Sequence, residues 1–211
     1  MINKLFVVII LWCVLFSSYL KAQQSYPLPS EIESFANTTL LVVLDGRDIS
    51  FDAFLKDAIS NHWKLTEYLI VDSERFNAEK GNPEYSFLVT LQIQFENDPE
   101  NNIYHYLQIL LSHQTADIQN MPVIMQIPFV GSTFTSSPYL HKTDMIVKFL
   151  HNYATNMVNS KQGNKYGNLK KLNSGIKELK GKTLMLSESQ IDLELRDVDV
   201  LRKVYKGNIE L

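Results

Sequence analysis

The stretch TLLVVLDGRDISFDAFLKDAISNHWKLTEYLIVD, residues 39–72, decides the fold. Residues 40–44 are all apolar, which is typical of a strand that is covered on both faces. A second short apolar run, residues 68–71, ends at Asp72. Between the two runs, apolar residues recur on one helical stripe; they are Phe51, Phe54, Leu55, Ala58 and Ile59. Strand, amphipathic helix and strand at this spacing predict a βαβ unit with parallel strands and a right-handed crossover.

Downstream of this unit the pattern becomes antiparallel. In residues 85–95 the odd positions are Tyr, Phe, Val, Leu, Ile and Phe and most even positions are polar, which indicates a strand with one buried face. A turn cluster at 97–102 precedes a second strand, 103–111. A third strand, 123–130, contains Pro128 and is therefore expected at an edge or a bulge. We predict a mixed α/β fold, in which the βαβ unit feeds an antiparallel three-stranded region and helices pack on the sheet.

The C-terminal part is expected to be mainly helical. Apolar residues from Met145 to Val158 form a helical stripe, and a second periodic run covers residues 169–179. Residues 183–186 are predicted to form a short strand, and Asp197 can cap a last helix. The chain stops at residues 208–211, which resemble the first half of a strand. Our hypothesis is that the natural protein continues beyond this point.

The N-terminus has the three parts of a secretory signal. Lys4 precedes an apolar run that begins at Leu5, and a more polar stretch ends at Ala22. A retained membrane anchor is the alternative, but a spanning helix needs roughly 20 apolar residues and this run is shorter. We therefore expect residues 1–22 to be a signal peptide and the protein to be exported to the periplasm or cell envelope, or secreted.

Export fixes the expected organisation of the remaining chain. Residues 23–38 contain two prolines and no periodic pattern, so we interpret them as a linker. Residues 39–211 are then a single α/β domain, and no stable membrane span remains after cleavage. A chain of this length can bury a sufficient core on its own.

Removal of the signal also changes the chemistry that the chain can perform. Cys13 is the only cysteine, so the mature chain would have no disulfide, no thiolate nucleophile and no Cys-based zinc site. Two of the 20 basic residues, Lys4 and Lys21, leave with the signal and none of the 23 acidic ones does, so the net charge becomes −5. This charge argues against nucleic acid as a partner, because such proteins need a positive surface.

Three aspartates are the candidate ligand-binding residues. Asp45 and Asp72 follow the two strands that we expect to be parallel, at the edge where open α/β sheets bind ligands. Together with Asp48 they could form a carboxylate cluster that holds a divalent cation through oxygen atoms. The alternative, which the sequence favours, is that an aspartate after a strand begins a turn and caps the next helix.

Other motifs give no reason to expect a cofactor or a resident metal ion. The five histidines include no pair at the helical spacing of a metal site, and the His-Glu-x-x-His motif is absent. Residues 131–137 follow a strand but lack the lysine and second glycine of a phosphate loop, so a hydroxyl-rich loop is the simpler interpretation.

Several segments together resemble a known group of proteins. These are the strand at 39–44, Phe54-Leu55-Lys56 with His62-Trp63 at the end of the helix, and Tyr85-Ser86-Phe87-Leu88 at the start of the long strand. They are similar to exported α/β proteins of Bacteroidetes-type bacteria that have no assigned activity. The resemblance implies further residues beyond Leu211, and it carries no functional residue to this chain.

Two functions from different classes remain open at this stage. The favoured one is a non-enzymatic module of the periplasm or cell envelope that binds a partner protein or an envelope component. The alternative is a metal-assisted hydrolase that uses Asp45, Asp48 and Asp72.

Overall fold

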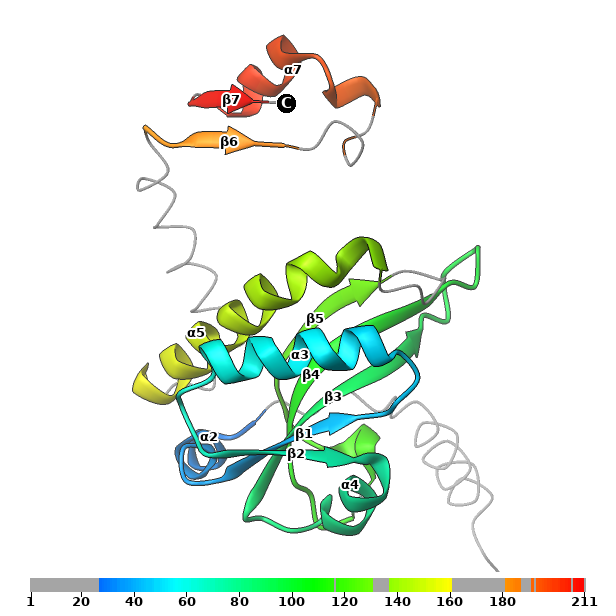
Figure 1. Cartoon of the computed structure of the whole chain (residues 1–211), viewed down its shortest axis with the longest axis vertical. Helices are drawn as coiled ribbons and strands as arrows, with labels where there is room; N and C mark the ends of the chain where they lie inside the picture. The colour runs from blue at the N-terminus through cyan, green and yellow to red at the C-terminus, as the bar shows by residue number, and fades with distance from the viewer. Residues whose placement is uncertain are drawn as a thin grey trace, which may run out of the picture. The chain divides into compact units, whose positions relative to one another are not determined.

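The computed structural model describes residues 27–115, 117–130, 137–160, 181–186, 191, 193–205 and 207–210. The chain forms two compact units, residues 1–163 and 164–211 (Figure 1). The predicted signal peptide, most of the predicted hydroxyl-rich loop and the predicted helix at 169–179 lie outside the described residues.

The segment that we interpreted as a linker contains a helix, which corrects that interpretation. Helix α2 (Pro29–Phe35) has proline in its first turn, where the missing N–H costs nothing. The Glu31 carboxylate accepts a hydrogen bond from the backbone N–H of Leu28 at 2.6 Å. Ile32 and Phe35 are fully buried in the core of the first unit. Two buried residues in so short a helix give no visible period, and this is why the pattern missed it.

The predicted βαβ unit is confirmed. Strand β1 (Thr39–Leu44), helix α3 (Ile49–His62) and strand β2 (Tyr68–Asp72) follow one another, and the two strands are parallel. Their register runs from Leu40 opposite Tyr68 to Leu44 opposite Asp72.

The remaining strands complete one five-stranded sheet in the order β2-β1-β3-β4-β5. After helix α4 (Ser73–Glu79), strand β3 (Tyr85–Gln94) pairs in parallel with the free side of β1. Strands β4 (Ile103–Leu111) and β5 (Val123–Val130) continue antiparallel, as predicted. Strand β5, which contains Pro128, lies at the edge of the sheet, and its pairing with β4 is irregular at two points.

Helices α2, α3 and α5 cover one face of the sheet. Helix α5 (Thr143–Ser160) follows the short 3-10 helix η2 (Ser137–Lys142) and packs beside α3 (Figure 1). The helix predicted from Met145 to Val158 is therefore confirmed, although Met145 itself is exposed and Val147 is buried. The core on this side includes Leu40, Leu55, Trp63, Leu88, Ile109 and Leu150.

The opposite face of the sheet is only partly covered. Helix α4 packs on β1 and β2 and places Phe76 against Leu41, Val43 and Phe87. A second 3-10 helix, η1 (Ile118–Asn120), lies before β5. The side chains near the end of β3 on this face stay half-buried or exposed, with Phe95 48% exposed just beyond the strand. This face therefore has a closed half near α4 and an open half along the β3–β4 hairpin.

The second unit is small. Strands β6 (Thr183–Met185) and β7 (Asn208–Glu210) form a parallel pair, and the 3-10 helix η5 (Leu193–Leu195) and helix α7 (Val198–Val204) lie between them in sequence. The predicted strand near 183–186 and the strand at 208–210 are confirmed. Asp197 caps α7 by accepting a hydrogen bond from the backbone N–H of Asp199 at 2.8 Å. Within the described residues of both units, no helix has the length and apolar content needed to cross a membrane.

Candidate functional site: the carboxyl edge and the open face of the sheet

The three predicted aspartates lie at the carboxyl edge of β1 and β2, but two of them are helix caps. The Asp48 carboxylate accepts a hydrogen bond from the backbone N–H of Phe51 at 2.9 Å and so caps α3. The Asp72 carboxylate accepts one from the N–H of Arg75 at 2.9 Å and caps α4. The capping alternative is thus confirmed for both residues. Among the described residues, no group of three or more His, Cys, Asp or Glu side chains could hold a metal ion.

Asp45, the third aspartate, is held by an arginine two residues away. Arg47 donates from Nε to the Asp45 carboxylate at 2.7 Å and from Nη2 to the same oxygen, and its backbone N–H donates to the other oxygen at 2.9 Å. Burial raises the pKa of Asp45, but the hydrogen bonds and charge of Arg47 outweigh burial and leave this pKa below its ordinary value. Asp45 is therefore an ionised partner of Arg47.

A further carboxylate that the sequence did not single out lies at the same edge. Asp52, in the first turn of α3, accepts a hydrogen bond from the backbone N–H of Gly46 at 3.2 Å. Gly46 has φ of +70°, a conformation that residues with a Cβ rarely adopt. Burial and the negative charge of Asp45 raise the pKa of Asp52, whereas its hydrogen bond from Gly46 opposes the rise.

A hollow of about 430 Å³ opens beside the Asp45–Arg47 pair. Its polar lining comes from this pair and from Ser73, Asn77 and Thr90, and apolar side chains of β1, β3 and α4 complete it. Asp45 is the only carboxylate in the lining and is already paired, so the hollow offers no acid–base couple of two carboxylates. Asp48 and Asp72 do not line it.

One histidine, His105 on β4, interacts electrostatically with the residues of this edge. Its side chain is on the helix-covered face of the sheet and is 2% exposed. Burial and the charge of Arg47 lower the pKa of His105, and the charge of Asp45 partly offsets them. His105 is therefore neutral at pH 7.

A hollow of about 700 Å³ runs along the open half of the sheet face that carries α4. It is larger than the hollow beside Asp45 and Arg47. We call it the β3–β5 trough. Its aliphatic lining consists of Leu91, Ile93, Ile118, Met121 and Val123. Its amide groups come from Gln108, Gln119 and Gln126. Gln92 and Gln94 also border it, but their side chains lie on the helix-covered face, because they stand opposite His105 and Ile103 in the register. Phe95 and Tyr106 add two aromatic rings, and Glu96 is the one charged residue that lines it.

The glutamines of the trough are partly fixed by one another. Gln108 on β4 is 2% exposed, and its Nε2 donates to Oε1 of Gln126 on β5 at 3.0 Å. This cross-strand bond orients both amides. The oxygen of Gln126 and the nitrogen of Gln108 face each other, so the nitrogen of Gln126 and the oxygen of Gln108 point away from the bond. The trough is thus lined by ordered amides next to aliphatic side chains.

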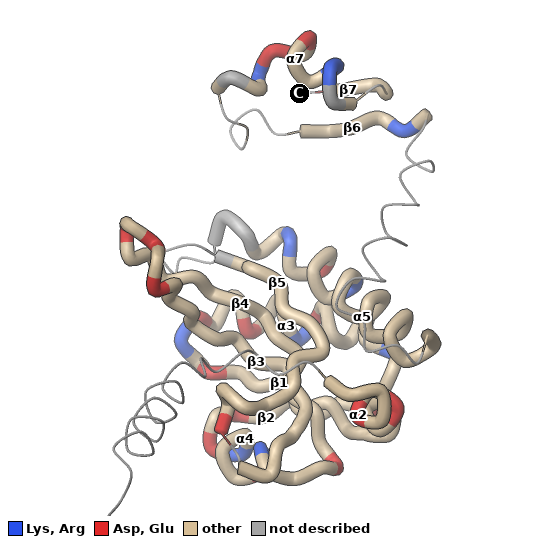
Figure 2. The backbone as a smooth tube through the Cα atoms, turned by 180° about the vertical axis from the view of Figure 1, so that it is seen from behind, with Lys and Arg blue, Asp and Glu red and all other residues tan. Residues whose placement is uncertain are grey.

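The strands below the trough carry no Lys, Arg, Asp or Glu. Figure 2 shows them uncoloured along their lengths, whereas acidic residues gather at the β3–β4 turn. Alternation predicted one buried face for β3, but it did not predict which polar residues of separate strands share the open face. That information lies in the strand register, where Val89 faces Gln108 and Gln108 faces Gln126.

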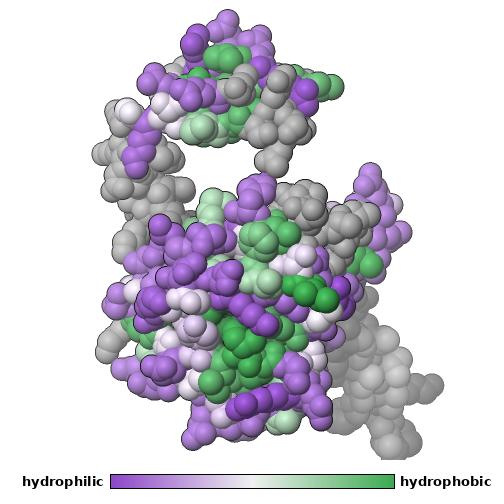
Figure 3. All heavy atoms as spheres, viewed as in Figure 1, coloured by the Kyte–Doolittle hydropathy of each residue, from purple (hydrophilic) through white to green (hydrophobic). Residues whose placement is uncertain are grey.

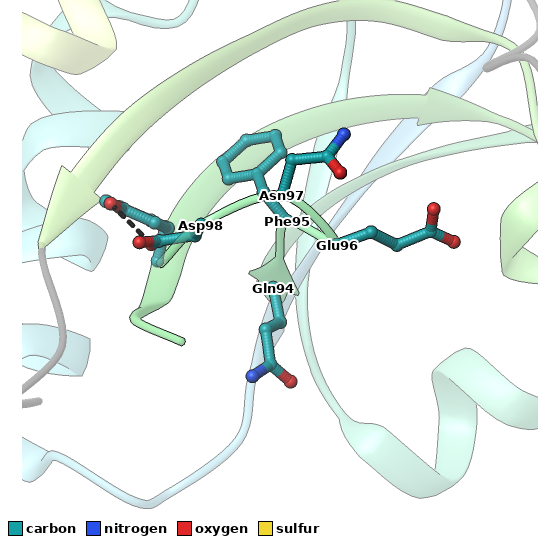
Figure 4. Close-up of a pocket in the computed structure, with 6 residues that line it drawn as sticks. Gln94, Phe95, Glu96, Asn97 and Asp98 are labelled. Atoms are coloured by element: carbon teal, nitrogen blue, oxygen red, sulfur yellow. Dashed lines mark hydrogen bonds between the residues drawn. The ribbon is translucent and has the colours of Figure 1, made fainter. Parts of the chain in front are cut away.

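The turn at one end of the trough lines an open hollow of about 730 Å³ (Figure 4). Asp98 fixes this turn, because its carboxylate accepts hydrogen bonds from the backbone N–H of Glu100 and of Asn102 and from the hydroxyl of Tyr104. Figure 4 shows Glu96 and Asp98 pointing to opposite sides of the turn. The pKa of Asp98 is lowered chiefly by the hydrogen bond from Glu100, and the bond to Asp98 raises the pKa of Tyr104.

A second group of titratable residues joins α3 to α5. Nε2 of His62 lies 2.7 Å from a carboxylate oxygen of Asp144, and Nδ1 of His151 accepts from the backbone N–H of Lys64 at 3.4 Å. Burial and the charges of His62 and Lys64 lower the pKa of His151. The His151 ring also packs edge-on against Trp63, which makes this group a contact between helices rather than an open pocket.

Comparison with known proteins adds no relative. No protein-family model matches this sequence, and comparisons with curated proteins and with solved structures find no significant similarity. The roles of the residues are therefore argued from their geometry alone.

Proposed function

We propose that this protein is an exported, non-enzymatic binding module of the periplasm or cell envelope, and that it holds a neutral segment of a partner protein in the β3–β5 trough. The observation that carries the proposal is the composition of the trough, in which the paired amides of Gln108 and Gln126 lie next to aliphatic and aromatic side chains on an open sheet face. Binding pockets in proteins commonly combine a mainly apolar lining with a few placed polar groups.

The aliphatic part of the trough supplies the affinity. Leu91 and Ile93 are half-buried and Phe95 is 48% exposed, so each has apolar area left to lose to a ligand. Covering about 100 Å² of such area contributes roughly 2.5 kcal/mol before the entropic cost of association. Apolar side chains of a peptide would fill this part of the trough.

The amide part supplies the selectivity. A glutamine side chain has one carbonyl acceptor and two N–H donors, the same groups that a peptide backbone offers. Gln119 is exposed beside the aliphatic residues and can pair with backbone groups of a bound segment. With Glu96 as the one charged residue in the lining, the trough favours a segment without net charge, because an unpaired charge brought against it would lose hydration.

Two isoleucines of one hairpin provide a matched test. Ile93 lines the trough, whereas Ile103 lies on the neighbouring strand and faces the other side of the sheet. Peptides selected on the wild-type protein from a random peptide library would be titrated by calorimetry against Ile93→Asp and Ile103→Asp. We expect Ile93→Asp to weaken binding at least tenfold and Ile103→Asp to leave it unchanged.

Backbone amide shifts in NMR spectra locate the bound peptide independently of the variants. We expect the largest shifts at residues 91–96 and at Gln126. Peptides that bind both variants equally and shift residues elsewhere would overturn the proposal, as would a library that yields no binder. A neutral oligosaccharide that binds the trough in the same titration, when peptides do not, would also overturn the protein-segment assignment.

A further inference from the structure

Strand β2 is an edge strand with apolar side chains on both of its faces. Among the described residues it pairs with β1 only, and it stands at the end of the sheet (Figure 1). Leu69 is 43% and Ile70 is 40% exposed. Figure 3 shows apolar surface beside α3, over β1 and β2. Soluble proteins usually protect such an edge with charges, proline or a bulge, because it can pair with another chain.

The hydrogen-bonding groups of β2 that point outward follow from its pairing with β1. The carbonyl of Glu67 accepts from the N–H of Leu40 at 2.8 Å, so Glu67 and every second residue after it face β1. The backbone N–H and C=O groups of Tyr68 and Ile70, and the N–H of Asp72, therefore face the open edge. The C=O of Asp72 belongs to the start of α4, as is usual for a cap residue.

We propose that β2 pairs antiparallel with β2 of a second copy of this chain, with Ile70 on the two-fold axis, so that the two sheets continue into one. In this register the two Ile70 residues exchange both N–H···O bonds. The Tyr68 carbonyl of each copy accepts from the Asp72 N–H of the other copy. Of the outward-facing groups, only the Tyr68 N–H is left without an acceptor in this register, because the Asp72 C=O belongs to the start of α4.

The side chains of β2 match themselves in this register. Ile70 meets Ile70 on the face that carries α3, and Leu69 meets Val71 on the face that carries α4. Cross-strand apolar pairs of this kind stabilise a sheet. A two-fold interface requires such self-complementarity, because the same patch must fit itself.

The charges that flank β2 are complementary under the same two-fold operation. Glu67 lies on the α4 face, since it shares the parity of Leu69 and Val71, and it is exposed. The register places it opposite Ser73 of the second copy, close to Arg75 in the first turn of that copy's α4. Arg75 is also exposed, so an acid and a base face each other at both ends of the paired strands. This complementarity selects a second copy over an unrelated strand.

Cysteine cross-linking tests the register. In the full chain with Cys13→Ser, an introduced cysteine is the only one. Ile70→Cys places two thiols opposite each other at about 5.5 Å between Cα atoms, within the range of a disulfide. In Tyr68→Cys the two thiols are four residues out of register, about 14 Å apart, and cannot join. We expect mild oxidation to give a covalent dimer with Ile70→Cys and none with Tyr68→Cys.

The oligomeric state supplies a second readout with a matched control. Ile70 and Ile103 are isoleucines on strands and are each 40% exposed. In sedimentation experiments we expect the wild-type chain and Ile103→Lys to be dimers and Ile70→Lys, with its two facing charges, to be a monomer with an unchanged circular dichroism spectrum. Glu67→Arg should weaken the dimer, and adding Arg75→Glu should restore it.

Three results would overturn the proposal. One is a wild-type chain that stays monomeric at millimolar concentration. This result also covers a monomer in which hydrogen exchange shows the Ile70 amide to be protected, because another part of the same chain then covers β2. Another is a dimer that persists in Ile70→Lys. The third is cross-linking that proceeds equally from positions 68 and 70.

Discussion

Replacing Asp48 by alanine removes one hydrogen-bond acceptor at the start of α3, the helix that contributes Phe51, Leu55 and Ile59 to the core. The carboxylate accepts from the Phe51 N–H at 2.9 Å, and losing such a cap costs about 1 kcal/mol of unfolding free energy, within a range of roughly 0.5–2 kcal/mol. Asparagine caps as well as aspartate does. Asp48→Asn should therefore change the unfolding free energy by less than about 0.5 kcal/mol.

The neighbouring charges make this comparison sharper. Asp48 and Asp45 both raise the pKa of Asp52 by repulsion, behind the larger effect of burial. Removing the charge of Asp48 relieves part of that repulsion, which offsets any loss of the favourable interaction between a carboxylate and the helix N-terminus. Asp48→Asn removes the charge but keeps a side-chain oxygen that can accept the hydrogen bond, whereas Asp48→Ala removes both. The difference in unfolding free energy between the two variants therefore measures the hydrogen bond.

Urea unfolding followed by tryptophan fluorescence gives the measurement. Trp63 is 2% exposed beside α3, and Trp12 is the only other tryptophan, so a chain that carries Trp12→Phe reports on the first unit alone. Equal losses from Asp48→Ala and Asp48→Asn would refute the capping role. So would a loss above about 3 kcal/mol that a chelator reproduces in the wild-type chain, since only a bound metal ion explains both.

Three further outcomes are expected. Because burial lowers the pKa of His105 below 6.5, the stability that its neutral form provides is complete above pH 6.5 and is lost as the pH falls through the lowered pKa. His105→Gln should flatten this part of the curve of unfolding free energy against pH, and an unchanged slope would contradict it. Phe35→Ala should cost about 3–5 kcal/mol because the ring is fully buried, whereas Leu28→Ala, at a residue that is 61% exposed, should cost less than about 0.5 kcal/mol in the same urea titration. Asp98→Ala should return the pKa of Tyr104 towards its ordinary value of 10.0, as measured by NMR titration of the ring, and should loosen the β3–β4 turn; a Tyr104 pKa that stays raised would show that another group holds it.

The local patterns of the sequence were enough to predict the elements with strong periodicity. The apolar run at 40–44, the stripe on α3 and the alternation along β3 each record contacts within a few residues, and the structure has all three elements. The N-cap roles of Asp48 and Asp72 were also predictable, because capping depends on the next turn of helix alone.

The arrangement of those elements was not predictable in the same way. Nothing in residues 85–88 indicates that β3 pairs with β1 rather than beginning a separate sheet, because this pairing joins Thr39 to Tyr85 across a long stretch of chain. The trough depends on it, since its residues come from three strands and a 3-10 helix. A sequence signal for the trough was present in the uncharged strands with repeated glutamine, but it does not say which glutamines share a face.

The pairing of Asp45 shows the same limit at a single residue. Its place after β1 was foreseen, and its neighbour Arg47 is two positions away in the sequence. Only the turn at Gly46, with its positive φ, brings the guanidinium back onto the carboxylate. Asp45, which the sequence suggested as a ligand for a metal cation, is thus paired with the guanidinium cation of Arg47.

Strand β1 lies between β2 and β3, although it precedes both in the sequence. During synthesis from the N-terminus, β1 therefore emerges with both of its edges unpaired, and the second edge stays unpaired until residues 85–88 follow. Sheets that need such distant pairings close slowly. Until both neighbours are in place, residues 39–44 present open strand edges that can pair with another chain.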